Sequence, residues 1–207
     1  DFASEGPIIK GKQASYNFNY RYSTFGLMMN FMPEGEGLPI YQDLCFKFNF
    51  PTKKAGTFTI WSVGALDDFY REAETDSLNW NMKEKRQSND AKFKTYIGGI
   101  NHKIILGSRS YMNTSLSGSY KYLSATVKFL EDSMQFTERH NAVNNDGLLV
   151  LSSFLNIKFN SNHSNRTGIV VEDLFYNFTD KNFNKANQQL EIEATGKGQA
   201  VRLQAYS

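Results

Sequence analysis

The residues best suited to catalysis or metal binding in this sequence are few and scattered. The three histidines are His102, His140 and His163, and none has a second ligand-type residue at the spacing that a zinc site on a helix or hairpin requires. A hydrolase would also need a serine or aspartate nucleophile within hydrogen-bond reach of one histidine. We place His102 and His163 in short turns and His140 in a long link on the opposite side of the molecule. The sequence therefore predicts no catalytic site, no cofactor and no metal.

The carboxylate pairs, the cysteine and a glycine pair also lack a specific chemical pattern. Asp67-Asp68 and Glu131-Asp132 are adjacent, and adjacent residues of a strand point to opposite faces. We interpret Asp67-Asp68 as charged residues at the point where a loop begins, rather than as a calcium site. Cys45 is alone, which excludes a disulfide framework within the sequence. Gly98-Gly99 is followed by no helix, so it is no phosphate-binding loop; in the wall of a barrel it would indicate a bend or a close approach to a plug.

Composition excludes several classes of function. The formal net charge of the 207 residues is +2, so no basic surface for nucleic acid is indicated. Aromatic residues make up 14% of the sequence. The mean hydropathy is −0.50, a value that also suits a β-barrel whose strands have one polar face. No apolar run reaches the length of a transmembrane helix. Asp1 to Pro7 lacks the basic start and apolar core of a signal peptide, and we expect that a leader was removed or that the chain starts within a longer protein.

The elements that would position any site are β-strands, because apolar and polar residues alternate along the sequence with a period of two. Ser15 to Tyr22 and Asp43 to Phe50 show the alternation most clearly. Further strands are predicted at about 57–62, 91–101, 109–120, 148–159, 166–178 and 200–207. The facing of 91–101 and 166–178 stays open, because apolar residues occur at both parities.

The sequence predicts that the links between these strands are alternately short and long. Short links are predicted at 51–56, near 102–108 and at 160–165, and long polar links at about 23–42, 65–90, 121–147 and 179–199. A short helical turn is expected within 23–32. Up-and-down barrels of bacterial outer membranes have short periplasmic turns and long extracellular loops. The predicted fold class is therefore all-β, an antiparallel up-and-down meander of about eight strands from a larger transmembrane barrel.

Each predicted strand has one apolar and one polar side, so the barrel interpretation assigns residues to lipid or to the lumen. The positions assigned to lipid are Tyr16, Phe18, Tyr20, Leu44, Phe46, Phe48, Phe58 and Ile60. The positions assigned to the lumen, where a plug or water would contact them, are Asn17, Asn19, Arg21, Lys47, Asn49, Thr57 and Thr59. Loop aromatics that offer stacking surfaces to a substrate are Tyr41, Phe69, Tyr70, Trp80 and Phe136.

Several segments resemble the barrel of Bacteroidetes TonB-dependent receptors, of the type with a carboxypeptidase-regulatory-like domain. They are Asn19 to Leu27, the longer block Leu38 to Phe58, Ser152 to Phe159 and Leu203 to Ser207. The block from Leu38 is the most specific, because it joins a loop end, a strand, a turn and the next strand in order. The start, Phe2 to Pro7, is similar to the end of a barrel strand.

The resemblance implies an active importer of a nutrient in the bacterial outer membrane. Its expected partners are outer-membrane lipid, its own plug domain and the TonB complex, and the sequence leaves open whether a surface lipoprotein is a further partner. No plug and no TonB box are found in the sequence, so we expect residues 1–207 to be a partial barrel domain, incomplete at both ends and without activity of its own. The imported substrate does not follow from the sequence.

Two other interpretations also fit alternating strands rich in aromatics. One is a soluble all-β ligand-binding module at the cell surface, similar to a carbohydrate-binding sandwich, in which the aromatics form a dry core. The other is a passive porin, which would require that about eight strands close on themselves.

Overall fold

The computed structural model describes residues 1–23 and 37–207, and this part of the chain forms nine β-strands. Two short 3-10 helices, η2 (Ser77–Asn79) and η3 (Lys83–Arg86), lie between the fourth and fifth strands. The strands are β1 (Phe2–Pro7), β2 (Ser15–Tyr22), β3 (Leu38–Pro51), β4 (Thr57–Arg71), β5 (Gln87–Gly107), β6 (Ser110–Leu130), β7 (Phe136–Lys158), β8 (Ser164–Asn184) and β9 (Gln189–Tyr206). The prediction of an all-β fold is confirmed, with β1 in addition to the eight strands expected.

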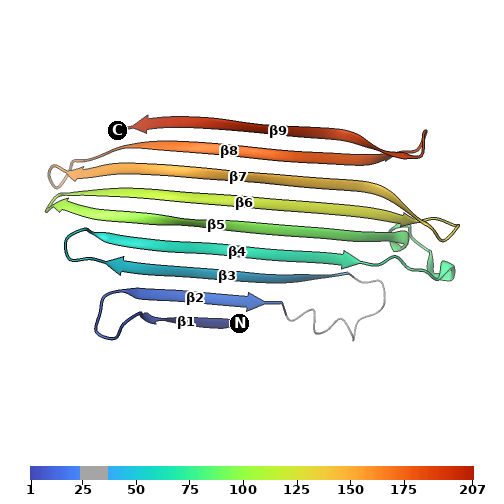
Figure 1. Ribbon diagram of the computed structural model, residues 1–207, viewed down its shortest axis with the longest axis horizontal. Coiled ribbons are helices and arrows are strands. Elements are labelled where there is room, and N and C mark those ends of the chain that lie inside the picture. Colours follow the sequence, from blue (N-terminus) through green and yellow to red (C-terminus); the bar gives the residue numbers. More distant parts are fainter. Residues whose placement is uncertain (24–36) are drawn as a thin grey trace.

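The strands form a single antiparallel sheet in which every strand pairs with its neighbours in sequence, in the order β1 to β9. Figure 1 shows one layer of strands, with the amino terminus near one edge and the carboxyl terminus at the other. β1 and β9 are not paired with each other, so the sheet is open. The predicted up-and-down meander is confirmed, and the open sheet is compatible with part of a barrel.

The links differ from those expected. The predicted long links at 121–147 and 179–199 are mostly strand, and the actual connections at these places are residues 131–135 and 185–188. Only the link between β4 and β5, residues 72–86, is long among the described connections. The prediction of alternately short and long links is therefore wrong for β6–β7 and β8–β9. The reason is that the hydrogen-bond ladder continues through hairpin arms that are richer in polar residues than the apolar stretches of these strands and do not continue their alternation, so the sequence of these arms resembles that of loops.

The strands β5 to β8 are consequently long. A strand of 21 residues, the length of β5, β6 and β8, extends for about 70 Å at roughly 3.3 Å per residue. A membrane-spanning strand needs about 9–11 residues. Each of these strands therefore has about half of its length available outside a bilayer. The predicted helical turn at 23–32 lies almost wholly outside the described residues.

The sheet has almost no core of its own. Ala73 and Leu130 are the buried apolar residues of the described part, and Ser23 is the buried polar one. The accessible surface is 14331 Å², whereas a compact monomer of 23.6 kDa exposes on the order of 9,800 Å². No helix in the described part is long and apolar enough to cross a membrane. The fold must therefore be stabilised by whatever covers its two faces.

Candidate functional site: the two faces of the sheet

One face of the sheet carries an unbroken apolar row that runs across eight strands. Residues directly opposite in an antiparallel pair share a face, and the register joins one residue from each of β2 to β9. The row consists of Tyr16, Phe48, Ile60, Ile100, Leu116, Leu151, Val171 and Leu203. We call this side the apolar face and the other side the polar face.

All eight residues that the sequence assigned to lipid lie on the apolar face. Phe18 pairs with Phe46, Tyr20 with Leu44, and Phe50 with Phe58, in rows parallel to the first. The same register settles the facing of β5: Tyr96 and Ile100 lie on the apolar face, whereas Phe93 and Ile97 lie on the polar face. The sequence could not decide this, because both parities of β5 carry bulky apolar residues.

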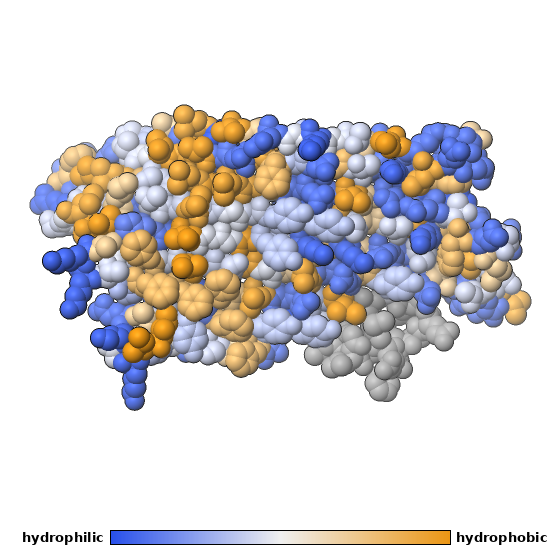
Figure 2. Space-filling view, in the orientation of Figure 1, coloured by the Kyte–Doolittle hydropathy of each residue, from blue (hydrophilic) through white to orange (hydrophobic). Residues whose placement is uncertain are grey.

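The apolar rows form a band that covers only part of each long strand. On β6 the band extends from Met112 to Tyr120, about 27 Å at roughly 3.4 Å per residue, which is of the same order as the ~25 Å apolar band of outer-membrane barrels. Figure 2 shows hydrophobic atoms gathered over the left half of the sheet and hydrophilic atoms over the right half. The right-hand boundary is a transverse row that contains Tyr20, Tyr96, Tyr120 and Phe175, in the place of an aromatic girdle.

The band has one charged interruption. Asp173 lies directly between Leu149 and Val201 on the apolar face. Its two carboxylate oxygens accept hydrogen bonds from Nε2 of Gln199, at 2.8 and 2.9 Å. The pair satisfies part of the hydrogen-bonding capacity of the carboxylate, and pairing reduces the cost of a carboxylate in an apolar setting.

The seven residues assigned to the lumen all lie on the polar face, and four of them form side-chain hydrogen bonds with residues of a neighbouring strand. Arg21 forms an ion pair with Asp43 at 2.7 Å, Thr59 donates to Asn49 at 3.1 Å, and Asn17 donates to Glu5. Lys47 is directly opposite Asn17 and Trp61, and Asn19 is opposite Cys45. Thr57 is opposite Pro51 and Lys103. These side chains therefore form a hydrogen-bonded polar wall.

The polar face also carries an apolar row that the sequence did not reveal. Val63, Ile97, Leu148 and Leu174 are joined through the register, with Ser119 between Ile97 and Leu148. Val63, Ile97 and Leu174 are each at least 36% exposed. The alternation of β7 conceals this row, because Leu148 to Leu151 are apolar at both parities.

The three histidines do not share a site. His102 is within β5 rather than in a turn; its ring stacks on Phe58 at 4.3 Å, and its Nε2 lies 2.6 Å from the carbonyl oxygen of Ala55. His140 is within β7 rather than in a link, and its Nδ1 lies 2.9 Å from Oδ1 of Asn182. His163 is in the link between β7 and β8, as predicted. Within residues 1–23 and 37–207, no group of three His, Cys, Asp or Glu residues is arranged to hold a metal.

The aspartate pair, the cysteine and the glycine pair considered from the sequence all lie within strands. Asp67 and Asp68 are inside β4 rather than at a loop base, and they point to opposite faces because they are adjacent. Cys45 is a half-buried free thiol within β3. At Gly99 a Cβ would lie 2.7 Å from the carbonyl oxygen of Leu116 on β6, so the backbone closely approaches the neighbouring strand here, and the approach to a plug stays a prediction.

A cluster of stacked cations and aromatics orders the right-hand tips of the sheet. Arg86 stacks over Trp80 at 4.2 Å and over Phe129 at 4.6 Å, and its Nε donates to the carbonyl oxygen of Leu130 at 2.8 Å. Arg139 stacks over Phe183 at 4.0 Å. Sequence reasoning missed this cluster, because its members come from the β4–β5 link and from β6, β7 and β8, which are far apart in the chain.

Of the loop aromatics proposed for substrate contact, Trp80 lies in this cluster, where its indole Nε1 donates to the carbonyl oxygen of Glu74 at 2.7 Å. Tyr41, Phe69, Tyr70 and Phe136 belong to strands rather than to loops. Tyr70 and Phe136 are 51% exposed. The structure therefore does not gather these five residues into one binding surface.

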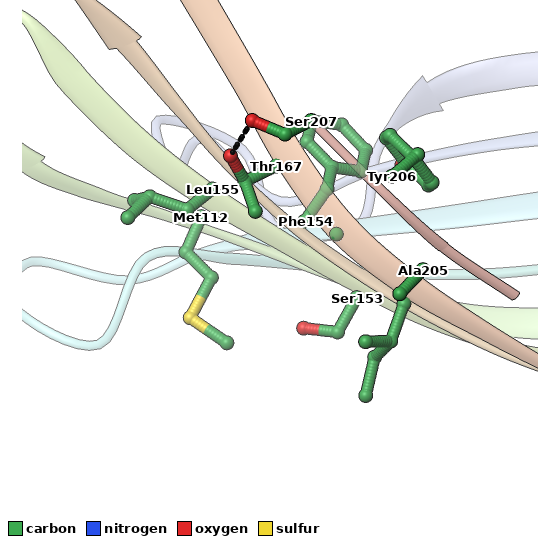
Figure 3. Close-up of a pocket in the computed structure, with 10 residues that line it drawn as sticks. Met112, Ser153, Phe154, Leu155, Thr167, Ala205, Tyr206 and Ser207 are labelled. Carbon is green, nitrogen blue, oxygen red and sulfur yellow. Dashed lines mark hydrogen bonds between the residues drawn. The ribbon is translucent and has the colours of Figure 1, made fainter.

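An open hollow of about 570 Å³ lies at the left-hand ends of β6 to β9. Figure 3 shows Met112, Ser153 and Ala205 around it, with a hydrogen bond between the hydroxyls of Thr167 and Ser207 at 3.0 Å. No histidine, cysteine or charged residue lines it. Its lining therefore offers hydroxyl groups but no histidine or carboxylate that could activate them.

Comparisons of the chain with protein-family models, with curated proteins and with solved structures find no match. The functional argument therefore depends on the sequence and on the geometry of the two faces.

Proposed function

We propose that this chain forms part of the barrel wall of a TonB-dependent receptor that imports a nutrient across a bacterial outer membrane. The observation that carries the proposal is the apolar row across β2 to β9, backed by a hydrogen-bonded polar wall on the opposite face. Barrel strands in an outer membrane alternate between lipid-facing apolar and lumen-facing polar residues. The resemblance of Leu38 to Phe58 to such receptors supplies the transporter class.

The polar face supports a filled interior rather than an empty channel. Its apolar row of Val63, Ile97, Leu148 and Leu174 would be exposed to water in an open pore, at a cost of about 25 cal/mol per Å² of apolar surface. The plug domain expected in such receptors would cover this row and offer hydrogen-bond partners to the polar residues beside it. In this proposal the TonB complex acts on the plug and not on the wall.

The soluble binding module is less compatible with the arrangement of the described residues. A sandwich requires a second layer that covers the apolar face, and here nine strands form one layer. The aromatic residues of the apolar face are exposed rather than enclosed, as Phe50 and Phe58 illustrate with exposures of 37% and 36%.

The test uses two neighbouring substitutions in the full-length protein. Phe48→Lys puts a cation in the central apolar row and is expected to reduce barrel stability by about 2–4 kcal/mol, with impaired assembly. Asn49→Lys puts the same cation on the polar face, one residue away, and is expected to assemble like the wild type. Heat modifiability on gels and the yield in outer-membrane fractions measure both. Equal assembly of the two variants would contradict the assignment of the apolar face to lipid.

A further inference from the structure

A slot on the apolar face lies next to the aromatic row, over β4. It has a volume of about 280 Å³. Ser62 and Gly64 form its floor, Tyr20 and Leu44 stand on one side and Tyr96 on the other. The slot exists because Gly64, between Leu44 and Tyr96 in the row, has no side chain.

The floor of the slot is compatible with an apolar occupant. The hydroxyl of Ser62 donates to the carbonyl oxygen of Ile97 at 3.0 Å, so its proton is already bonded. Asp43 contributes to the lining only from its backbone side, because its carboxylate is bound by Arg21 on the polar face. The slot is at the lower end of the size range of ligand sites, and it therefore suits a segment of an acyl chain rather than a whole lipid.

The rim of the slot toward the right-hand tips is polar and cationic. The Tyr20 hydroxyl donates to Oε1 of Gln42 at 3.0 Å, which leaves the amide nitrogen of Gln42 as the donor group of this side chain. Lys94 is directly opposite Leu66, which lines the slot. Its ammonium lies 5.5 Å from the centre of the Tyr122 ring, and it forms no ion pair with the carboxylates of residues 1–23 and 37–207.

We propose that this slot binds one membrane lipid with an anionic phosphate headgroup, its acyl chain over Gly64 and its phosphate at Lys94 and Gln42. The inference rests on the proposed function, since the slot faces lipid only if the apolar face does. Charge complementarity selects the occupant: an apolar trough beside an amide donor and a lysine that has no carboxylate partner among residues 1–23 and 37–207 matches an acyl chain joined to a phosphate. A neutral or zwitterionic headgroup would leave the charge of Lys94 without a net partner.

Native mass spectrometry of the full-length protein tests the proposal, with phosphatidylglycerol and phosphatidylcholine added separately in detergent. We expect one phosphatidylglycerol to be retained at least about tenfold more strongly than phosphatidylcholine. Gly64→Leu fills the trough and should abolish this retention. The substitution is compatible with the fold, because a Cβ at Gly64 would meet only Tyr96, at 3.4 Å, and the Thr95 carbonyl oxygen, at 4.0 Å.

The charge is tested by a matched pair of lysines. Lys94→Gln should weaken the retention of phosphatidylglycerol about tenfold. Lys197→Gln should leave it unchanged, because Lys197 belongs to the same transverse row on the apolar face but lies on β9, opposite Asn177. Equal retention by all variants, or equal retention of the two lipids, would overturn the proposal. Displacement of the lipid by free glycerol phosphate would also overturn the proposal. The detection of a bound polypeptide that is lost in Gly64→Leu would overturn it as well.

Heat modifiability of the same samples separates this proposal from the proposed function. A wild-type protein that inserts into membranes but retains no particular lipid would overturn the lipid site alone. A wild-type protein that does not associate with membranes at all would overturn the proposed function as well.

Discussion

At the scale of single residues, the sheet is fixed by contacts between directly opposite side chains, and several of these join a glycine to an aromatic ring. Gly64 is opposite Tyr96, Gly147 is opposite Phe175, and Gly196 is opposite Phe178. A Cβ at Gly147 would lie 2.2 Å from the Phe175 ring, so the ring covers the glycine. Such pairing of aromatics with strand glycines helps to define the register of a sheet.

Gly99 offers a prediction about close packing of backbones. A Cβ there would lie 2.7 Å from the Leu116 carbonyl oxygen and 2.9 Å from Cβ of Ser117, and these atoms cannot rotate away. Gly99→Ala is expected to reduce stability by about 1–3 kcal/mol through overpacking. Gly64→Ala, where the nearest atom would lie at 3.4 Å, is the control and should change stability by less than about 0.5 kcal/mol. Urea unfolding in lipid vesicles measures both, and equal stability of the two variants would contradict the prediction.

Glu191 offers a prediction about pH at the tip of the β8–β9 hairpin. Hydrogen bonds from Asn184, and then from Asn187, lower the pKa of this carboxyl below its ordinary value of 4.5. A lowered native pKa stabilises the hairpin tip at pH values above 4.5, and this contribution is lost as the pH falls through the native pKa. Amide exchange at residues 185–191 should therefore become less protected between about pH 5 and pH 3.

Glu191→Gln is the control for this pH dependence. The amide does not titrate, so the loss of protection between pH 5 and pH 3 should disappear at the tip. Persistence of the same pH dependence in Glu191→Gln would assign the effect to another group.

At the scale of elements, the long arms of β5 to β8 replace the long loops that the sequence predicted. The alternation in Ser15 to Tyr22 and Asp43 to Phe50 identified strands and their facing, because one parity there is wholly apolar. Beyond the band this contrast changes. Residues 179–184 are polar at both parities except for Phe183, and in 121–128 the apolar residues Leu123, Ala125 and Val127 lie at the parity opposite to that of the band. In both segments the hydrogen-bond ladder with the neighbours continues the strand. Pairing of this kind is a non-local property, which explains why the sequence located the band but not the arms.

The prediction from the sequence was least accurate at the tips of these arms. A substitution of Arg86 tests which contacts order the tips. Its guanidinium joins η3 to the β6–β7 connection through the Leu130 carbonyl oxygen and through Asp132 at 2.7 Å. Arg86→Met keeps an apolar stem but leaves the carbonyl of Leu130, which is 1% exposed, without this donor. We expect the free energy of local opening to fall by about 2 kcal/mol.

Hydrogen exchange at residues 72–86 and 131–135 measures this change. Lys85→Met removes the neighbouring charge, and Lys85 makes no side-chain contact among the described residues that would order the tips, so it should leave the exchange unaltered. Unchanged exchange in Arg86→Met would show that the surrounding aromatics order the tips without the cation.

At the scale of the whole molecule, the sheet exposes apolar surface and strand edges that a folded protein normally covers. Its accessible surface of 14331 Å² exceeds by nearly half the value of about 9,800 Å² for a compact monomer of this mass. Two different surfaces account for the excess: the faces, which side chains cover, and the outer edges of β1 and β9, which present unpaired backbone groups. The bilayer that we propose would cover the apolar face, whereas only another strand satisfies an edge.

This distinction predicts how the 207-residue chain behaves when it is produced by itself. In buffer it should aggregate, because neither the apolar face nor the edges are covered. In dodecyl maltoside the apolar face is covered but the edges are not, so the chain should become β-structured and form discrete oligomers through β1 and β9. The full-length receptor that we propose should instead be monodisperse in the same detergent, since further strands would continue the sheet at both edges. Circular dichroism and sedimentation velocity distinguish these states. A folded monomer in plain buffer would contradict the membrane assignment, and a folded monomer in detergent would show that the edges of this chain close on each other.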